Sequence, residues 1–191
     1  MKLQKGEPGY ISKRKQRYLA WTLAEAAVVA GLLIFGYVQT GTKMNLFTVA
    51  AVLGCLPAAK MLVEFITMAP HRGIEADKYE EIEACAPLLV RIYDLIITSR
   101  ERVMPVAAIA ISGHVVCGYA PSPKTDEEAC AAYLKEMLRT NRYDKMTVKI
   151  FHDYKAFLAR VEGMNNIASV EQAENLRREE HIKSFILSVS M

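Results

Sequence analysis

Two long apolar stretches within the first seventy residues constrain the fold more than any other feature of the sequence. Residues 18–39 (YLAWTLAEAAVVAGLLIFGYVQ) carry one charged residue, Glu25, and residues 45–69 (NLFTVAAVLGCLPAAKMLVEFITMA) carry two, Lys60 and Glu64. A helix needs ~20 apolar residues to cross a bilayer. Because the linker between the stretches is short, the sequence predicts an antiparallel hairpin of two transmembrane helices. A cleavable signal peptide fits less well. The apolar region of a signal peptide spans only ~7–15 residues, whereas residues 18–39 are longer and a second apolar stretch follows them directly.

The placement of basic residues predicts the orientation of this hairpin. Residues 1–17 contain six lysines and arginines and one glutamate, whereas the linker between the spans contains only Lys43. Basic residues accumulate on the cytoplasmic side of membrane proteins, so both ends of the chain are expected in the cytoplasm. We therefore expect a multi-pass protein of the cell inner or plasma membrane. It would comprise a basic tail (1–17), the hairpin (18–69) and a cytoplasmic domain (70–191).

Charge and cysteine content restrict the partners of the expected domain. Residues 70–191 hold 16 basic and 18 acidic residues, so the net charge of +3 comes from the N-terminal tail. A nucleic-acid surface on the domain is therefore disfavoured, whereas the tail can attract anionic lipid besides setting the topology. The four cysteines form no CxxC pair, which fits reduced thiols rather than a disulfide framework or a zinc site. No cofactor or metal is expected.

The three charged residues inside the spans are candidate functional residues. At 1.5 Å per residue, Glu25, Lys60 and Glu64 lie ~10, ~13 and ~8 Å from the cytoplasmic ends of their helices. Glu25 is thus bracketed in depth by the other two, and Lys60 and Glu64 share one helical face. Charges inside a bilayer face protein or water, so one interpretation is a cluster buried between helices. Snorkelling of Lys60 and Glu64 to the membrane surface, and a transport or gating role, are the alternatives.

Small residues mark a second face on each predicted span. Ala27 and Gly31 are spaced by four on the first helix, as are Ala50, Gly54 and Ala58 on the second. This pattern lets helix backbones approach closely. At 100° per residue, the stripes lie ~120–140° away from the charged residues. Because a lone hairpin has one internal interface, two faces unsuited to lipid predict a homo-oligomer or another membrane partner.

Residues 70–191 predict a small α/β (α+β) domain with a mixed sheet of about three strands. The expected order is helix, strand, strand, helix, strand, helix, helix. The predicted strands are 105–111 and 114–120 around a Ser112-Gly113 turn, then 146–152, with a short strand at Ile167–Val170 as an option. The predicted helices are 78–98 with an interruption at Pro87, one from a Thr125/Glu128 capping box through Thr140, 154–162 ending at Gly163, and 172–188.

The order of elements loosely resembles the core of restriction-endonuclease-like proteins. That resemblance would imply a divalent-metal site, with an acidic residue near the strand hairpin and an acid-x-Lys on the next strand. Residues 103–121 contain no Asp or Glu, which argues against nuclease chemistry. Phosphate-binding loops, nucleophile elbows and HExxH motifs are also absent from the sequence. Ser112, His114, Cys117 and His152 are weaker chemical candidates, which turn formation, core packing and strand ends explain more simply.

The sequence therefore favours a non-enzymatic, membrane-anchored and homo-oligomeric protein. Its domain would act as an interaction, scaffold or regulatory module toward a protein partner or ligand, and no catalytic residue is assigned. As a class, the chain resembles the small two-span membrane proteins with a cytoplasmic domain that bacteria encode. Two alternatives stay open: an oligomeric transport or channel-like protein that uses the intramembrane charges, and a membrane-tethered nuclease-like or hydrolase domain.

Overall fold

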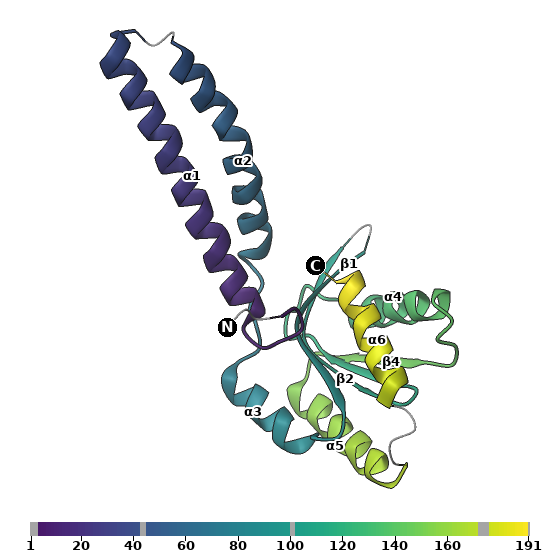
Figure 1. Cartoon of the computed structure of the whole chain (residues 1–191). Coiled ribbons are helices and arrows are strands. Elements are labelled where there is room, and N and C mark those ends of the chain that lie inside the picture. Colours follow the sequence, from purple (N-terminus) through teal and green to yellow (C-terminus); the bar gives the residue numbers. More distant parts are fainter. Residues whose placement is uncertain (1–3, 43–44, 100–101, 172–175, 191) are drawn as a thin grey trace. The chain divides into compact units, whose positions relative to one another are not determined.

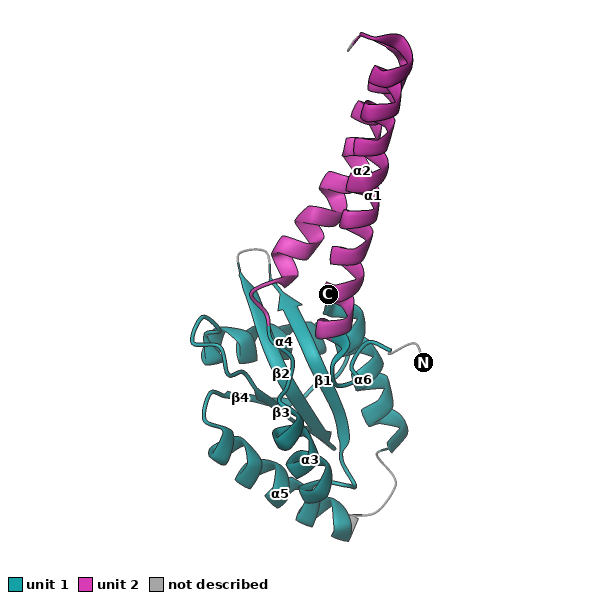
Figure 2. Cartoon of the chain, turned by 90° about the vertical axis from the view of Figure 1, so that its left-hand side faces the viewer, with its two compact units in different colours: residues 1–10, 72–191 teal, residues 11–71 magenta. Residues whose placement is uncertain are grey.

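The structure is a computed structural model that describes residues 4–42, 45–99, 102–171 and 176–190. The chain divides into two compact units, coloured separately in Figure 2. Residues 11–71 form the first, which we call the hairpin unit. Residues 1–10 and 72–191 form the second, which we call the α/β domain.

The hairpin unit consists of helix α1 (Tyr10–Thr40) and helix α2 (Leu46–Met68) (Figure 1). Both helices are long and apolar enough to cross a membrane. Helix α1 begins eight residues before the expected span, so residues 10–17, with four of the six basic residues of the tail, are part of the helix. Asn45 caps α2, because its side chain accepts a hydrogen bond from the backbone N–H of Thr48 at 2.8 Å.

Each hairpin helix packs against the other through one line of buried and half-buried residues, which we call its seam. Successive seam residues are separated alternately by four and three positions. This spacing is typical of helices that pack at a shallow crossing angle. The seam of α1 is half-buried or buried at Tyr18, Thr22, Glu25, Val29, Leu32 and Gly36, and that of α2 at Phe47, Ala51, Gly54, Ala58, Met61, Phe65 and Met68. Between Leu19 and Ile66, the large apolar side chains outside the seams are exposed among the described residues, whereas Ile11, near the start of α1, is buried.

The α/β domain is built on one mixed sheet of four strands in the order β1-β2-β3-β4. The strands are β1 (Val90–Thr98), β2 (Val103–Ser112), β3 (Val115–Tyr119) and β4 (Thr147–Phe151). The first three are antiparallel, and β4 runs parallel to β3 after the crossover helix α4 (Glu127–Thr140). The predicted mixed α/β domain is therefore confirmed, although the sheet has four strands rather than about three.

Helices cover both faces of the sheet (Figure 1). Helices α3 (Ala76–Cys85) and α5 (Tyr154–Glu171) pack on one face around Ile82, Phe157 and Val161. Helices α4 and α6 (Leu176–Val189) pack on the other face, where Leu134, Leu138, Ile182 and Ile186 meet the larger core. The sheet thus has two buried faces, and its strands read as continuous apolar runs.

The predicted helix over 78–98 is wrong from Val90 onward, where the chain forms β1. Asp94 has a φ of 55°, in the left-handed region, and the sheet faces switch there. Val90 and Ile92 contribute to the core under α4 and α6, and so do Leu95 and Ile97 beyond the switch. Because both faces of β1 are buried, its run is almost continuously apolar, so a helical stripe through Leu89, Ile92 and Ile96 fits it as well as a strand does.

Several predicted element ends also differ from the structure. Helix α5 runs through Gly163 to Glu171, so the optional strand at 167–170 is not formed. A Cβ at Gly163 would meet nothing within 4 Å, so nothing there stops the helix. The cap of α4 is Asp126, which accepts from Ala129 N–H at 3.0 Å. Residues 172–175 of the predicted last helix lie outside the described residues.

Candidate functional site

Glu25 lies in the seam of α1, where it faces α2. Its neighbours along the seam contact α2 closely, since a Cβ added at Gly54 would lie 3.2 Å from Cγ2 of Val29. The Oε2 atom of Glu25 is buried and has no hydrogen-bond partner among the described residues. A buried polar atom that is left without a hydrogen bond costs roughly 1–3 kcal/mol.

The single hairpin does not bring the three predicted charges together. Lys60 is exposed on the side of α2 away from the seam, whereas Glu64 is half-buried beside it. The carboxylate of Glu64 lies near the hydroxyl of Tyr18. No ion pair joins Lys60 to Glu25 or Glu64 within the described parts of residues 11–71. A cluster of all three charges stays a prediction for an assembly of hairpins.

The predicted small residues divide between the seam and the outer surface. Gly54 and Ala58 lie in the α2 seam, whereas Ala27 and Ala50 are exposed. A Cβ at Gly31 would meet nothing within 4 Å, so this glycine is not needed for packing inside the hairpin. The stripes therefore mark two different surfaces, one internal and one external.

Sequence reasoning missed the closest approach in the hairpin, at Gly36. An added Cβ there would lie 2.7 Å from Cβ of Phe47 and 2.8 Å from Oδ1 of Asn45. The helices also bury Ala51 at 1% exposure. The alternating spacing of Ala51, Gly54 and Ala58 was the signal that could have identified this seam, because a spacing of four alone does not distinguish the two faces.

The weaker chemical candidates in the α/β domain are held apart. Cys117 and Cys130 are buried on opposite faces of the sheet, in the core under α5 and the core under α4 respectively. Nδ1 of His152 lies 2.6 Å from the carbonyl oxygen of Ala120 and donates to it, which ties strand β4 to the end of β3. Among the described residues, no three His, Cys, Asp or Glu side chains could together hold a metal ion.

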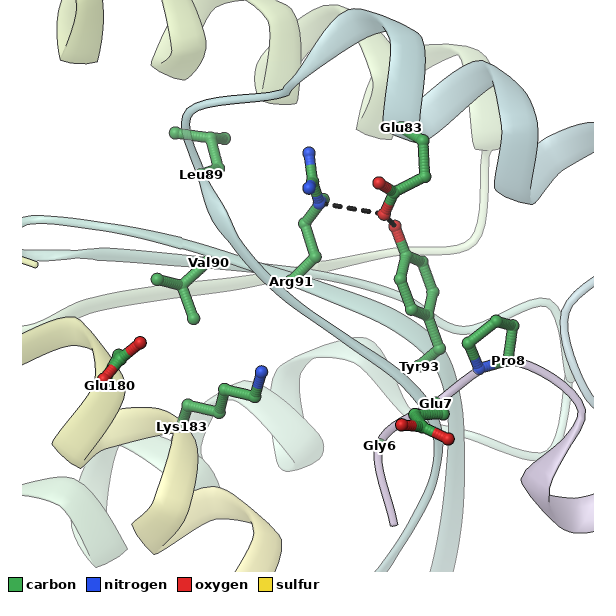
Figure 3. Close-up of a pocket in the computed structure, with 10 residues that line it drawn as sticks. All are labelled: Gly6, Glu7, Pro8, Glu83, Leu89, Val90, Arg91, Tyr93, Glu180 and Lys183. Carbon is green, nitrogen blue, oxygen red and sulfur yellow. Dashed lines mark hydrogen bonds and ion pairs between the residues drawn. The ribbon is translucent and has the colours of Figure 1, made fainter. Parts of the chain in front are cut away.

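A cleft of about 280 Å³ lies in the α/β domain beside strand β1 (Figure 3). Its floor is Leu89, Val90, Arg91 and Tyr93, at the start of β1. Its walls come from three segments that are distant in sequence: Gly6, Glu7 and Pro8 before α1, Glu83 on α3, and Glu180 and Lys183 on α6. Because β1 is an outer strand, this cleft opens directly onto a sheet edge.

Hydrogen bonds fix one wall of the cleft. Oε1 of Glu83 accepts from Nε of Arg91 at 3.0 Å and from the hydroxyl of Tyr93 at 2.8 Å (Figure 3). The Arg91 guanidinium also donates to the carbonyl oxygen of Ala86. Burial, with the neighbouring Glu83 carboxylate, raises the pKa of Tyr93 above its usual value, so its hydroxyl remains a donor. The Arg91 side chain is thus held toward α3.

The N-terminal segment forms the opposite wall and is bound to the domain by its backbone. The carbonyl oxygen of Gly6 accepts from Tyr93 N–H at 2.9 Å. The ammonium of Lys5 donates to the carbonyl oxygens of Leu187, at 2.6 Å, and Ser190. These carbonyls end helix α6, so the lysine compensates the negative end of its dipole. Part of the basic tail therefore has a structural role inside the domain.

Comparison with protein families, with characterised proteins and with solved structures finds no match to this chain.

Proposed function

We propose that the chain is a membrane-anchored, self-associating protein whose α/β domain acts as an interaction module. The observation that carries this proposal is the exposure of the hairpin. In the most apolar 18-residue window of each hairpin helix, only 6% of the residues are buried. A core helix of a soluble protein would be mostly buried, so lipid is the environment that suits these surfaces.

The expected topology places both connections to the α/β domain in the cytoplasm. Basic residues precede α1, and the loop between the helices has few, so the positive-inside rule supports this orientation. The test is thiol labelling of intact cells, in a chain whose Cys55 and Cys85 are replaced by serine. A membrane-impermeant reagent should label a Thr42→Cys variant, and a Ser184→Cys variant only after permeabilisation.

Each outcome of the labelling experiment is decisive for the topology. Cys117 and Cys130 can stay in the chain, because they are buried and give little background. Labelling of the Ser184→Cys variant in intact cells would reverse the proposed orientation. Release of the protein from membranes by alkaline carbonate, without detergent, would refute the transmembrane anchor itself.

Self-association is supported by the outer surface of the hairpin. Lys60 is exposed there, together with the small residues Ala27, Gly31 and Ala50. A charged side chain that faces lipid is unfavourable, so a neighbouring protein surface would stabilise it. Subunit counting in bilayers should therefore give more than one copy for the wild-type chain.

Gly31 and Gly54 provide a matched pair for this test. Gly31→Ile adds bulk outside the hairpin and should reduce the oligomer while leaving the hairpin folded, because no atom lies within 4 Å of its added Cβ. Gly54→Ile should instead disturb the hairpin, because its Cβ alone would lie 3.2 Å from Cγ2 of Val29. Monomers for the wild-type chain, or an unchanged oligomer for Gly31→Ile, would count against association through this face.

A second candidate function is transport, and Glu25 is the observation that favours it. Its buried, unpartnered carboxyl oxygen lies inside a helix seam, the type of position that ion pathways use. Proton or cation flux into liposomes that contain the protein, abolished by Glu25→Gln, would support transport. Absence of flux with the wild-type oligomer would remove this candidate.

A further inference from the structure

The outer edge of β1 is partly covered by the chain's own ends. Tyr93 N–H points away from β2 and donates to Gly6 of the N-terminal segment. Ile97, farther along the strand, forms an isolated antiparallel bridge with Ser190. Native proteins protect outer strands in this way, because exposed backbone groups pair readily with other chains.

One position on this edge is left open. Backbone groups of a strand alternate in direction, so Arg91 N–H and C=O point the same way as those of Tyr93, two residues on. They face the cleft, whose floor includes Arg91. No backbone partner for Arg91 on this side is found among the described residues. Its side chain cannot cover the edge, because Glu83 and Ala86 hold it toward α3.

The dimensions and charges of the cleft restrict what it can accept. A volume of about 280 Å³ is just below the ~300–1,000 Å³ of small-molecule pockets, so it suits a short segment rather than a folded surface. Glu7, Glu83 and Glu180 outnumber Arg91 and Lys183 in the lining. Figure 3 shows Lys183 extending from α6 toward β1, and Glu180 on the same helix. The excess of carboxylates favours a basic side chain on the occupant.

We propose that this cleft binds an extended, basic peptide segment of a partner protein, which adds to the sheet by pairing its backbone with Arg91. Main-chain hydrogen bonds would supply affinity, and the surrounding carboxylates would select the side chains. The inference rests on the proposed interaction role of the domain and names the place where the partner docks. It does not depend on which way the hairpin crosses the membrane.

The test uses the full chain in detergent micelles and a fluorescent hexapeptide of alternating valine and lysine with blocked ends. Anisotropy should report binding, after subtraction of binding to empty micelles. Replacing lysine by glutamate in the peptide should abolish binding. Methylating the peptide nitrogens of the lysine peptide should weaken it by about tenfold, the effect of losing roughly one or two hydrogen bonds.

Amide hydrogen exchange gives a second readout that is specific to strand addition. Arg91 N–H should exchange fast in the free protein and slowly with peptide, whereas Tyr93 N–H should be protected in both states by Gly6. Glu180→Lys should weaken peptide binding about tenfold, as expected for reversing one contacting charge. Glu128→Lys, at an exposed site on α4 that is not part of the lining, is the matched control and should bind normally.

Three results would overturn the inference: equal binding of acidic and basic peptides, equal binding of the methylated peptide, or unchanged exchange at Arg91 with saturating peptide. If any of these occurs while the protein resists carbonate extraction and self-associates, the membrane anchor stands and only the docking site is lost. A chain that carbonate extracts from membranes would instead refute the anchor and leave the peptide result to be judged by itself.

Discussion

Asp94 is the residue whose replacement tests the structure of β1 most directly. It is 1% exposed, it has a φ of 55° within a strand, and its Oδ1 accepts from Ile74 N–H at 2.7 Å. An added Cβ at Gly73 would lie 2.7 Å from its Oδ2. The side chain of Asp94 therefore fixes the segment before α3, and the left-handed backbone of Asp94 marks the point where the side chains of β1 change faces.

Three substitutions separate these two roles. Asp94→Ala removes the hydrogen-bond acceptor, which lowers the free energy of unfolding by ~1–3 kcal/mol. Alanine also tolerates the left-handed backbone at φ 55° poorly, which lowers it by roughly 1–2 kcal/mol more. Asp94→Gly removes the acceptor without the second penalty. Asp94→Asn keeps an oxygen acceptor and a residue type that tolerates this backbone. The expected loss of stability therefore increases from Asn to Gly to Ala, with ~1–2 kcal/mol between Gly and Ala.

The assay must report on the α/β domain inside the full chain. Trp21, the only tryptophan, lies in α1, so tryptophan fluorescence does not follow unfolding of the domain. Pulse proteolysis across a urea series, in detergent micelles, gives the free energy of unfolding of the cleavable domain. Equal stabilities for the Ala and Gly variants would refute the cost assigned to the backbone. An Asn variant as damaged as the Ala variant would refute the role of the acceptor.

Three further perturbations have expected outcomes that follow from single contacts. Phe157→Ala should lower the free energy of unfolding by ~3–5 kcal/mol in the same assay, because Phe157 is fully buried against Tyr119. In the native chain at pH 8, iodoacetamide should modify Cys85 before Cys130, as read by mass spectrometry, because burial raises the pKa of Cys130 to about 12. The hydrogen bond from Ala129 N–H holds the pKa of the Asp126 carboxyl below its usual value. The ionised carboxylate therefore stabilises the folded domain at neutral pH, and this stabilisation is lost as the pH falls through the lowered pKa. Asp126→Asn should therefore flatten the acidic part of a plot of melting temperature against pH.

The sequence was sufficient to predict what depends on local pattern. The two apolar helices, the turn after Ser112 and the helix that ends at Thr140 are encoded by nearby residues, and they occur close to the predicted positions. Which face of a hairpin helix turns inward was harder to predict. Glu25 and Lys60 are both charged residues in apolar helices, yet only Glu25 lies in a seam. Which of the two residues faces the other helix depends on the alternating spacing of the small and apolar seam residues. The charges of Glu25 and Lys60 do not indicate this.

The cleft beside β1 could not be predicted, because the burial of both faces of β1 concealed the strand. Its almost continuous apolar run also fits a helical stripe, so the pattern predicts a helix for a segment that is the outer strand of the sheet. The segment before α1 binds this strand through Gly6 and Tyr93, and the segment after α2 binds it through Ile74 and Asp94. Both chain connections of the hairpin unit therefore end on adjacent residues of one strand. A helix in its place would have neither an edge for Gly6 to join nor an open position at Arg91, so a single error about backbone conformation concealed the whole site.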